Sequence, residues 1–311
     1  MMRRGLLWLS EQKSIFNFVR RNGVARQFAS RFVAGESVEE AVAAAGVLAE
    51  RGITASLDLL GESITQASEA EAAGEQYVRM ISVMAMRPNV EVNVSVKLTQ
   101  MGFDVDEALC VRIMQRIVET AAQNNGFVRL DMEGSAYTQR TLDFFAQKLY
   151  PNHGQHCGVV IQSALRRSDQ DIARLIDMQA RVRLCKGAYL EPPTVAYPDK
   201  ADVDRAYIRL MEQLLRAGNY PGLATHDESI LTHARKFTQR EGIEPARFEF
   251  QMLYGVRRDL QERLRQAGQN MRVYIPFGTQ WYPYLMRRLA ERPANIAFIL
   301  GNIVKESVPG L

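Results

Sequence analysis

The sequence contains little cysteine, no long apolar run and no recognisable leader. Its three cysteines, Cys110, Cys157 and Cys185, are an odd number and form no CxxC pair. This excludes a disulfide framework and indicates a reducing compartment. No apolar stretch is long enough to span a bilayer, and Met1–Ser10 is too short for a signal-peptide core. We therefore expect a cytoplasmic protein. Peripheral contact with the inner face of the membrane stays open, and co-sedimentation with anionic liposomes at low salt would test it.

Several familiar motifs are also missing. Gly61 is the only glycine directly after the first predicted strand, so the Gly-rich phosphate loop of a doubly wound sheet is absent. No G-x-S-x-G segment supplies a nucleophile elbow. Only four histidines occur, and two of them, His153 and His156, precede a strand as surface or loop residues. We expect no metal site.

What the chain does contain is a regular alternation of strands and helices. Short apolar runs are typical of buried parallel strands, and amphipathic stretches separate them at intervals of about 30 residues. The predicted strands are Ile53–Leu60, Val90–Leu98, Phe127–Met132, Gly158–Ser163, Arg181–Lys186, Gly222–His226, Phe248–Leu253 and Arg272–Pro276. The predicted helices are 64–86, 104–124, 138–149, 169–179, 200–217, 228–240, 256–267 and 279–291. This pattern predicts an α/β fold, a (β/α)₈ TIM barrel, over residues 51–311.

Residues 1–50 are predicted to form a separate helical segment in front of the barrel. Ser37 and Glu40 have the spacing of a capping box, which opens an Ala-rich helix over residues 38–50. Extra N-terminal helices and a last helix over the C-terminal face would make this a variant of the barrel.

Polar residues gather where the predicted strands end, which is where barrel enzymes place their active sites. Lys97 is the only cation in its apolar run, so either a structural ion pair with Asp131 or an anionic ligand would explain it. The segment Arg183–Tyr189 suits either a phosphate- or flavin-binding turn or an ordinary strand end. His226 could be a general base, a metal ligand or a hydrogen-bond donor to a cofactor.

The last predicted helix carries a polar face. Tyr284, Arg287, Arg288 and Glu291 lie at i, i+3, i+4 and i+7, whereas Leu285, Met286 and Leu289 point the other way. Paired arginines suit forked recognition of a carboxylate, although a solvated charged face is the commoner meaning of such a pattern. Arg287 and Arg288 add to the cations at the predicted strand ends, which are Lys97, Arg183 and Lys186. This number of cations predicts a site that binds at least one anion.

Eight segments, in order and covering most of the chain after residue 50, resemble the monofunctional bacterial FAD-dependent proline dehydrogenases. They are Leu57–Glu62, Val94–Leu98, Leu130–Glu133, Val160–Ser163, Arg183–Tyr189, Ala224–Asp227, Phe248–Gly255 and Tyr274–Glu291. The resemblance implies oxidation of L-proline to Δ1-pyrroline-5-carboxylate by hydride transfer to FAD, with a quinone as the electron acceptor. Transient contact with pyrroline-5-carboxylate dehydrogenase would fit, and nucleic acid is not an expected partner.

The resemblance also implies roles for individual residues. Arg287, Arg288 and Lys97 would hold the substrate carboxylate, and Glu62 would pair with Arg287 to close the site. The predicted walls around the proline ring are Tyr274, Tyr284 and Leu253. Asp131 would orient Lys97, and Arg183 would stabilise negative charge on the reduced flavin. The positions implied in FAD binding are Met132, Gln162, Arg183, Lys186, Gly187, Ala188, Thr225, His226 and Glu291.

Two other functions stay open at this point. One is a related flavin enzyme acting on hydroxyproline, which a comparison of kcat/KM for the two imino acids would distinguish; the resemblance implies that Tyr284 crowds a 4-hydroxyl group. The other is a non-catalytic barrel that binds an anion or RNA through its mildly basic surface, since the formal charge is +4. The chain departs from bifunctional relatives at Leu190, where they carry tryptophan.

Overall fold

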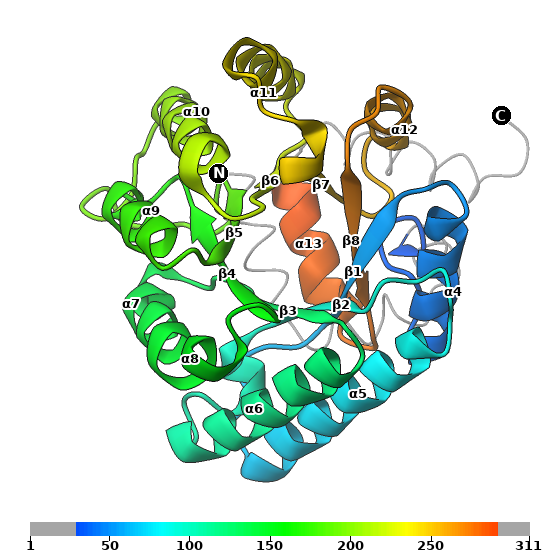
Figure 1. Ribbon diagram of the computed structural model, residues 1–311. Coiled ribbons are helices and arrows are strands. Elements are labelled where there is room, and N and C mark those ends of the chain that lie inside the picture. The colour runs from blue at the N-terminus through cyan, green and yellow to red at the C-terminus, as the bar shows by residue number, and fades with distance from the viewer. Residues whose placement is uncertain (1–28, 292–311) are drawn as a thin grey trace, which may run out of the picture.

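The computed structural model describes residues 29–291, which form a closed barrel of eight parallel strands surrounded by helices (Figure 1). The strands are β1 (Thr54–Leu59), β2 (Asn93–Val96), β3 (Phe127–Leu130), β4 (Cys157–Gln162), β5 (Arg181–Cys185), β6 (Gly222–Ala224), β7 (Glu249–Leu253) and β8 (Met271–Phe277). Each strand pairs with its sequence neighbours, and β1 closes the ring on β8. The predicted (β/α)₈ fold is confirmed.

The helices cover the outside of the ring, and one crosses its end. They are α4 (Val38–Ala49), α5 (Ala67–Ala85), α6 (Glu107–Gln123), α7 (Ser135–Phe144), α8 (Tyr150–His153), α9 (Ser168–Asp177), α10 (Lys200–Ala217), α11 (Glu228–Glu241), α12 (Arg258–Gln266) and α13 (Trp281–Glu291). Three short turns are η1 (Leu98–Met101), η2 (Phe145–Leu149) and η3 (Pro245–Arg247). Within residues 29–291, no helix has both the length and the apolarity needed to cross a bilayer.

Three of the predicted elements, one helix and two strands, have other boundaries in the structure. The single helix expected over residues 138–149 is instead α7, a π-helical turn and the short α8. Strand β2 ends at Val96, so Lys97 lies just beyond it in extended backbone rather than inside the strand. Thr225 and His226 likewise follow β6. Lys97, Thr225 and His226 therefore follow their strands and line the end of the barrel, although Thr225 N still donates to Gln251 O of β7.

Helix α4 takes the outer position that the helix after β8 occupies in a regular barrel. The predicted capping box is present, since Ser37 Oγ accepts from Glu40 N at 3.3 Å and Glu40 Oε2 accepts from Ser37 N at 3.0 Å. The helix packs against β1, β8 and α5, and its Val38 and Val42 belong to the main apolar core. Figure 1 shows α4 on the rim of the barrel.

Because α4 fills that position, α13 is free to lie across the centre of the ring, as Figure 1 shows. Its buried residues Trp281, Tyr282, Tyr284, Leu285 and Met286 form a second apolar cluster with Ala29, Val33 and Leu60. Leu60 directly follows β1, so this cluster fixes α13 at the C-terminal end of the strands. The predicted helix over the C-terminal face is confirmed.

The interior of the barrel is charged rather than apolar. In β1, Leu57 and Leu59 belong to the apolar core, whereas Ser56 Oγ lies 3.0 Å from Ser95 Oγ of β2. Arg183 of β5 reaches Ser95 at 3.1 Å, a contact that crosses the lumen because β2 and β5 are not neighbours. Alternation along strands such as β1 and β2 therefore places apolar side chains toward the helices and polar ones inside.

Candidate functional site

A buried ion pair stands at the C-terminal end of β1 and β2. Lys97 Nζ lies 2.7 Å from Asp58 Oδ1, and both side chains are almost fully buried. Asp131, which the sequence suggested as the partner of Lys97, is farther away, with its Oδ2 at 3.9 Å from Nζ. That part of the prediction was incomplete, because the register of β1 against β2 brings Asp58 closer.

Asp131 connects three other groups of the site. Its Oδ1 accepts a hydrogen bond from Arg183 Nη1 at 2.8 Å, and its Oδ2 accepts one from Tyr274 Oη at 2.7 Å. The Arg183 guanidinium also lies over the Tyr274 ring, 5.2 Å from its centroid. The structure thus brings together the predicted residues Lys97, which follows β2, Asp131, which follows β3, Arg183 of β5 and Tyr274 of β8.

Burial and charge fix the protonation states of this cluster. Burial alone would lower the pKa of Lys97, but the carboxylates of Asp58 and Asp131 outweigh it and raise that pKa. Burial and the same carboxylates raise the pKa of the Tyr274 phenol well above its usual value. Lys97 is therefore an ammonium and Tyr274 a neutral donor at physiological pH.

Arg183 is held on two sides inside the lumen. Gln251 Oε1 accepts from its Nε at 2.5 Å, while Ser95 Oγ and Asp131 Oδ1 accept from its Nη1. A guanidinium so constrained is a fixed positive charge beside the barrel mouth, suited to an anionic group that develops next to it.

Gln162 and Gly187 form a cradle at the ends of β4 and β5. Gln162 Nε2 donates to the carbonyl oxygens of Met132 and Glu133, both at 3.1 Å. Its Oε1 is buried and has no hydrogen-bond partner among the described residues. Gly187 has φ +104°, and a Cβ there would come 3.3 Å from that oxygen. A buried acceptor beside an open glycine fits the ring N–H of a flavin.

Lys186 lies between two carboxylates. Its Nζ is 2.6 Å from Asp204 Oδ1 and 3.0 Å from Asp227 Oδ2. Asp227 also caps α11 by accepting from Ser229 N. The predicted role of Lys186 toward a cofactor stays a prediction, and in this structure the lysine joins the loop after β5 to α10 and α11.

His226 accepts rather than donates at its ε nitrogen. The backbone N–H of Leu253 donates to His226 Nε2 at 3.0 Å, which leaves Nδ1 as the protonated nitrogen of a neutral ring. This use of Nε2 argues against the metal-ligand interpretation of His226. Within residues 29–291, no group of three or more His, Cys, Asp or Glu side chains could hold a metal ion.

The remaining predicted residues lie around the same end of the barrel. Thr225 Oγ1 accepts from Asp227 N at 3.2 Å, Leu253 ends β7, and Glu62 follows β1. Met132 is buried after β3, and Ala188 follows Gly187. The sequence predicted that Leu285 and Met286 point away from Tyr284 on the last helix. All three side chains are buried on α13, so the two faces of this helix do not differ in burial at these positions.

Arg287, Arg288 and Glu291 belong to the last turns of α13. Their side chains lie outside the described part of the structure, so the predicted carboxylate clamp stays a prediction.

Asp58 is the main site residue that the sequence reasoning did not single out. The signal was present, because Asp58 is the only charge in the apolar run Ile53–Leu60, much as Lys97 is the only cation in its own run. Glu133 is also buried and well held: its carboxylate accepts from Thr99 N at 3.2 Å and from Thr99 Oγ1 at 2.6 Å. It fixes the turn after Lys97 and lies next to Met132.

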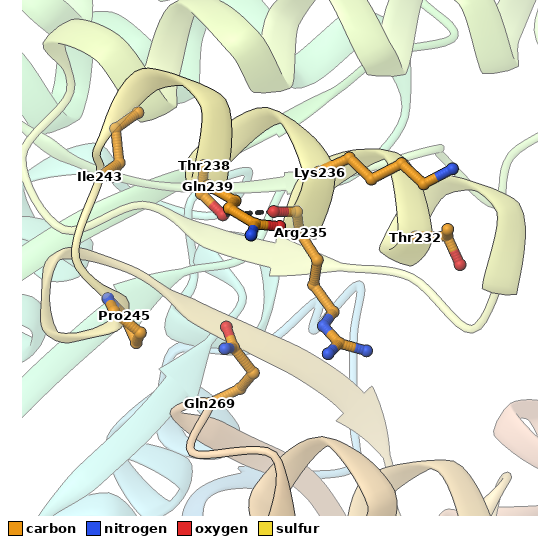
Figure 2. A pocket seen from close by; sticks show the side chains of 8 residues that line it. All are labelled: Thr232, Arg235, Lys236, Thr238, Gln239, Ile243, Pro245 and Gln269. Atoms are coloured by element: carbon orange, nitrogen blue, oxygen red, sulfur yellow. Dashed lines mark hydrogen bonds between the residues drawn. The ribbon is translucent and has the colours of Figure 1, made fainter.

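A hollow elsewhere on the surface does not belong to this site. Figure 2 shows it between the end of α11, the turn η3 and Gln269. Those segments precede β7 and β8, so the hollow lies at the opposite end of the barrel from Lys97 and Arg183.

Known proteins share both the sequence and the fold. A family model described as proline dehydrogenase matches residues 41–300. Proline dehydrogenase of Deinococcus radiodurans is 42% identical over 306 residues, which cover 97% of this chain and 98% of that protein. Proline dehydrogenase 1 of Bacillus subtilis strain 168 is 38% identical over 306 residues, covering 98% of this chain and 100% of the relative.

A solved structure, proline utilization A from Bdellovibrio bacteriovorus inactivated by N-propargylglycine, superposes with a TM-score of 0.80 at 26% identity. It aligns with 89% of this chain but only 34% of that protein, so our chain spans about a third of the longer one. The family match, the near full-length relatives and the residues gathered at the barrel mouth agree: the chain belongs to the proline dehydrogenase family.

Proposed function

We propose that this protein oxidises L-proline to Δ1-pyrroline-5-carboxylate with a bound FAD as the hydride acceptor. The observation that carries the proposal is the cluster of Lys97, Asp131, Arg183 and Tyr274 at the mouth of the barrel. It combines an ammonium for a carboxylate, a neutral phenol and a fixed guanidinium in one place. The names of the relatives, which are proline dehydrogenases, support the same substrate.

In this proposal Lys97 seats the substrate carboxylate together with Arg287 and Arg288. The raised pKa of Lys97, which the carboxylates of Asp58 and Asp131 cause against the opposing effect of burial, keeps it charged while the substrate binds. Tyr274 and Leu253, with Tyr284 from α13, wall the pyrrolidine ring and fix its tilt. Such orientation of a small rigid ring is the main contribution a protein makes to a cofactor reaction.

The residues present fit a flavin. Gln162 Oε1 is a buried acceptor, Gly187 leaves room beside it, and Thr225 and His226 line the adjacent strand end. When bound, FAD supplies the acceptor for the hydride that leaves the ring carbon next to nitrogen. Arg183 would contribute a fixed positive charge beside the reduced flavin, and the substrate amine would release its proton to solvent before the neighbouring ring carbon gives up the hydride.

We infer that a quinone reoxidises the flavin, in line with the family resemblance. Contact with an enzyme that consumes the product would also suit this chain, because it is 28% identical to a part, 24%, of the bifunctional protein PutA of Escherichia coli.

Absorption spectroscopy tests the function directly. The purified protein should show the flavin bands, lose them when proline is added without oxygen, and regain them on addition of a short-chain quinone. A protein that stays colourless after reconstitution with FAD, or a spectrum that proline does not change, would contradict the proposal. If proline bleaches the flavin but a quinone does not restore it, only the acceptor assignment fails.

Changing Arg288 to lysine should raise the KM for proline roughly tenfold or more with a smaller effect on kcat, because a point charge replaces a two-bond fork. Steady-state kinetics measures this. Arg209→Lys is a matched control, because Arg209 binds Asp169 through Nε at 2.8 Å and Nη2 at 2.6 Å on the outside of the barrel. Equal KM values for Arg288→Lys and the control would argue against the clamp.

A further inference from the structure

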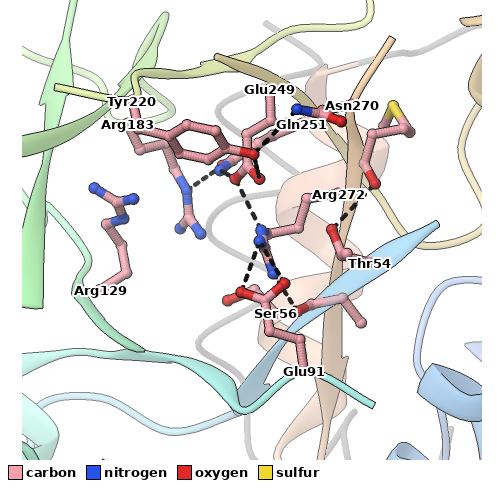
Figure 3. Close-up of polar contacts among 12 residues, drawn as sticks. Thr54, Ser56, Glu91, Arg129, Arg183, Tyr220, Glu249, Gln251, Asn270 and Arg272 are labelled. Atoms are coloured by element: carbon pink, nitrogen blue, oxygen red, sulfur yellow. Dashed lines mark hydrogen bonds and ion pairs between the residues drawn. The ribbon is translucent and has the colours of Figure 1, made fainter. Parts of the chain in front are cut away.

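A chain of buried polar residues runs beneath Arg183 toward the other end of the barrel (Figure 3). Gln251 Oε1 accepts from Arg183 Nε, and Gln251 Nε2 donates to Glu249 Oε1, each at 2.5 Å. The same Glu249 oxygen accepts from Arg272 Nε at 2.8 Å, and Arg272 Nη2 reaches Glu91 at 3.0 Å. Arg183, Gln251, Glu249 and Arg272 are each 5% exposed or less.

We propose that Gln251 is a positioning residue for Arg183, holding its guanidinium in a fixed orientation without neutralising its charge. This inference rests on the proposed function, in which Arg183 stabilises the reduced flavin.

The amide of Gln251 can adopt only one orientation here. Its oxygen faces a guanidinium and its nitrogen faces a carboxylate, so a flipped amide would oppose donor to donor and acceptor to acceptor. Glu249 in turn stays charged: burial raises its pKa, but Arg272 and the hydrogen bond from Gln251 outweigh that effect and lower it. The charges of Glu249 and Arg183 therefore determine which end of the Gln251 amide donates a hydrogen bond and which end accepts one.

The fold also reserves space for this amide. Gly222 of β6 pairs with Glu249, and a Cβ at position 222 would come 2.4 Å from Gln251 Nε2. Strand β6 therefore carries a glycine where any side chain would push the amide from its place. A substitution at Gly222 can therefore displace the amide of Gln251 while residue 251 stays glutamine.

A neutral amide matters because Arg183 already contacts one carboxylate. Asp131 accepts from Nη1, and Gln251 and Ser95 supply the other contacts with uncharged oxygens. A second carboxylate at position 251 would reduce the positive potential that the guanidinium presents at the barrel mouth, and would repel Glu249. The Nη2 group takes no part in these contacts.

The test compares Gln251→Met, Gln251→Glu and Gly222→Ala in the full-length protein loaded with FAD. Gln251→Met keeps the size of the side chain and removes both hydrogen bonds, so kcat should fall about tenfold while KM changes less than about threefold, because Lys97 is untouched. Gly222→Ala should shift kcat in the same direction. Gln251→Glu should make the reduction potential of the flavin more negative, as measured by spectroelectrochemistry.

The pH profile distinguishes positioning from mere packing. The carboxyl introduced by Gln251→Glu would face Arg183, Glu249, Arg272 and, beyond Arg183, Asp131. Once protonated it donates to Glu249 and accepts from Arg183, as the amide does, so its kcat relative to wild type should rise as the pH falls. Gln251→Met has no carboxyl group at this position, so its kcat relative to wild type should not rise as the pH falls.

Thr54→Val is the matched control, because Thr54 Oγ1 donates to Met271 O at 3.2 Å between β1 and β8, and the hydrogen bonds of Gln251 and Arg183 do not involve it. It should leave kcat and potential unchanged, and urea unfolding of the apoproteins reports folding separately. If wild type binds FAD and oxidises proline, but Gln251→Met and Gln251→Glu match it in kcat and potential, the positioning role is refuted. If wild type itself neither binds FAD nor oxidises proline, the proposed function fails instead.

Discussion

Replacing Asp58 by asparagine should lower the free energy of unfolding by about 3 kcal/mol, the cost of leaving a buried partner uncompensated. Lys97 loses its contact at 2.7 Å and keeps only Asp131, whose Oδ2 lies 3.9 Å away. The KM for proline should rise about tenfold, since an ammonium that is no longer held loses about 1.4 kcal/mol of carboxylate binding. Urea unfolding monitored by circular dichroism and steady-state kinetics measure the two effects.

An exposed ion pair provides the control for this variant. Arg79 and Glu39 lie 2.5 Å apart with side chains 64% and 55% exposed, so Glu39→Gln should cost less than about 1 kcal/mol. The double variant Asp58→Asn with Lys97→Met should recover stability without recovering affinity, because it removes the stranded charge together with the substrate contact. If Asp58→Asn lowers the free energy of unfolding no more than Glu39→Gln does, the predicted cost of leaving Lys97 without its partner is contradicted.

The fold was predictable because each strand is marked by its outward-facing residues. Leu57 and Leu59 of β1, or Val94 and Val96 of β2, contact the helices and produce the short apolar runs on which the barrel prediction rested. A helix after the eighth strand was predictable in the same way, but its place across the ring depends on α4, which packs against β1 and β8 on the outside. Strand ends were less predictable, since Lys97 and His226 continue the local pattern but form no ladder bonds.

The interior partners could not be predicted in the same way. Arg129 and Arg272 are charges within buried strands, and nothing local distinguishes an arginine in a barrel lumen from one on a sheet surface. The contact between Lys97 and Asp58 joins residues 39 positions apart and depends on the register of β1 and β2. The link from Arg183 to Ser95 crosses the barrel and requires its closure.

Changing Asp131 to asparagine should lower kcat roughly a hundredfold, comparable to removing one preorganised electrostatic contact in other active sites. Its two oxygens accept from Arg183 at 2.8 Å and from Tyr274 at 2.7 Å. An asparagine has one oxygen and one donor group, so it can satisfy one of these donors only by opposing the other. It also removes a negative charge that raises the pKa of Lys97. Anaerobic rapid mixing with proline would measure the rate of flavin bleaching.

Tyr274→Phe distinguishes the contribution of the Asp131–Tyr274 hydrogen bond from that of the Asp131–Arg183 contact. It deletes the phenol hydroxyl and leaves the contact of Asp131 with Arg183, so the bleaching rate should fall less than in Asp131→Asn. If loss of Tyr274 Oη accounts for the whole decrease, Asp131 acts by orienting the phenol. If Tyr274→Phe leaves the bleaching rate nearly unchanged, Asp131 acts through Arg183 and Lys97, by holding these two positive charges in place. A bleaching rate for Asp131→Asn within threefold of wild type would contradict both interpretations, because the carboxylate would then be a structural link between strands and no part of the reaction.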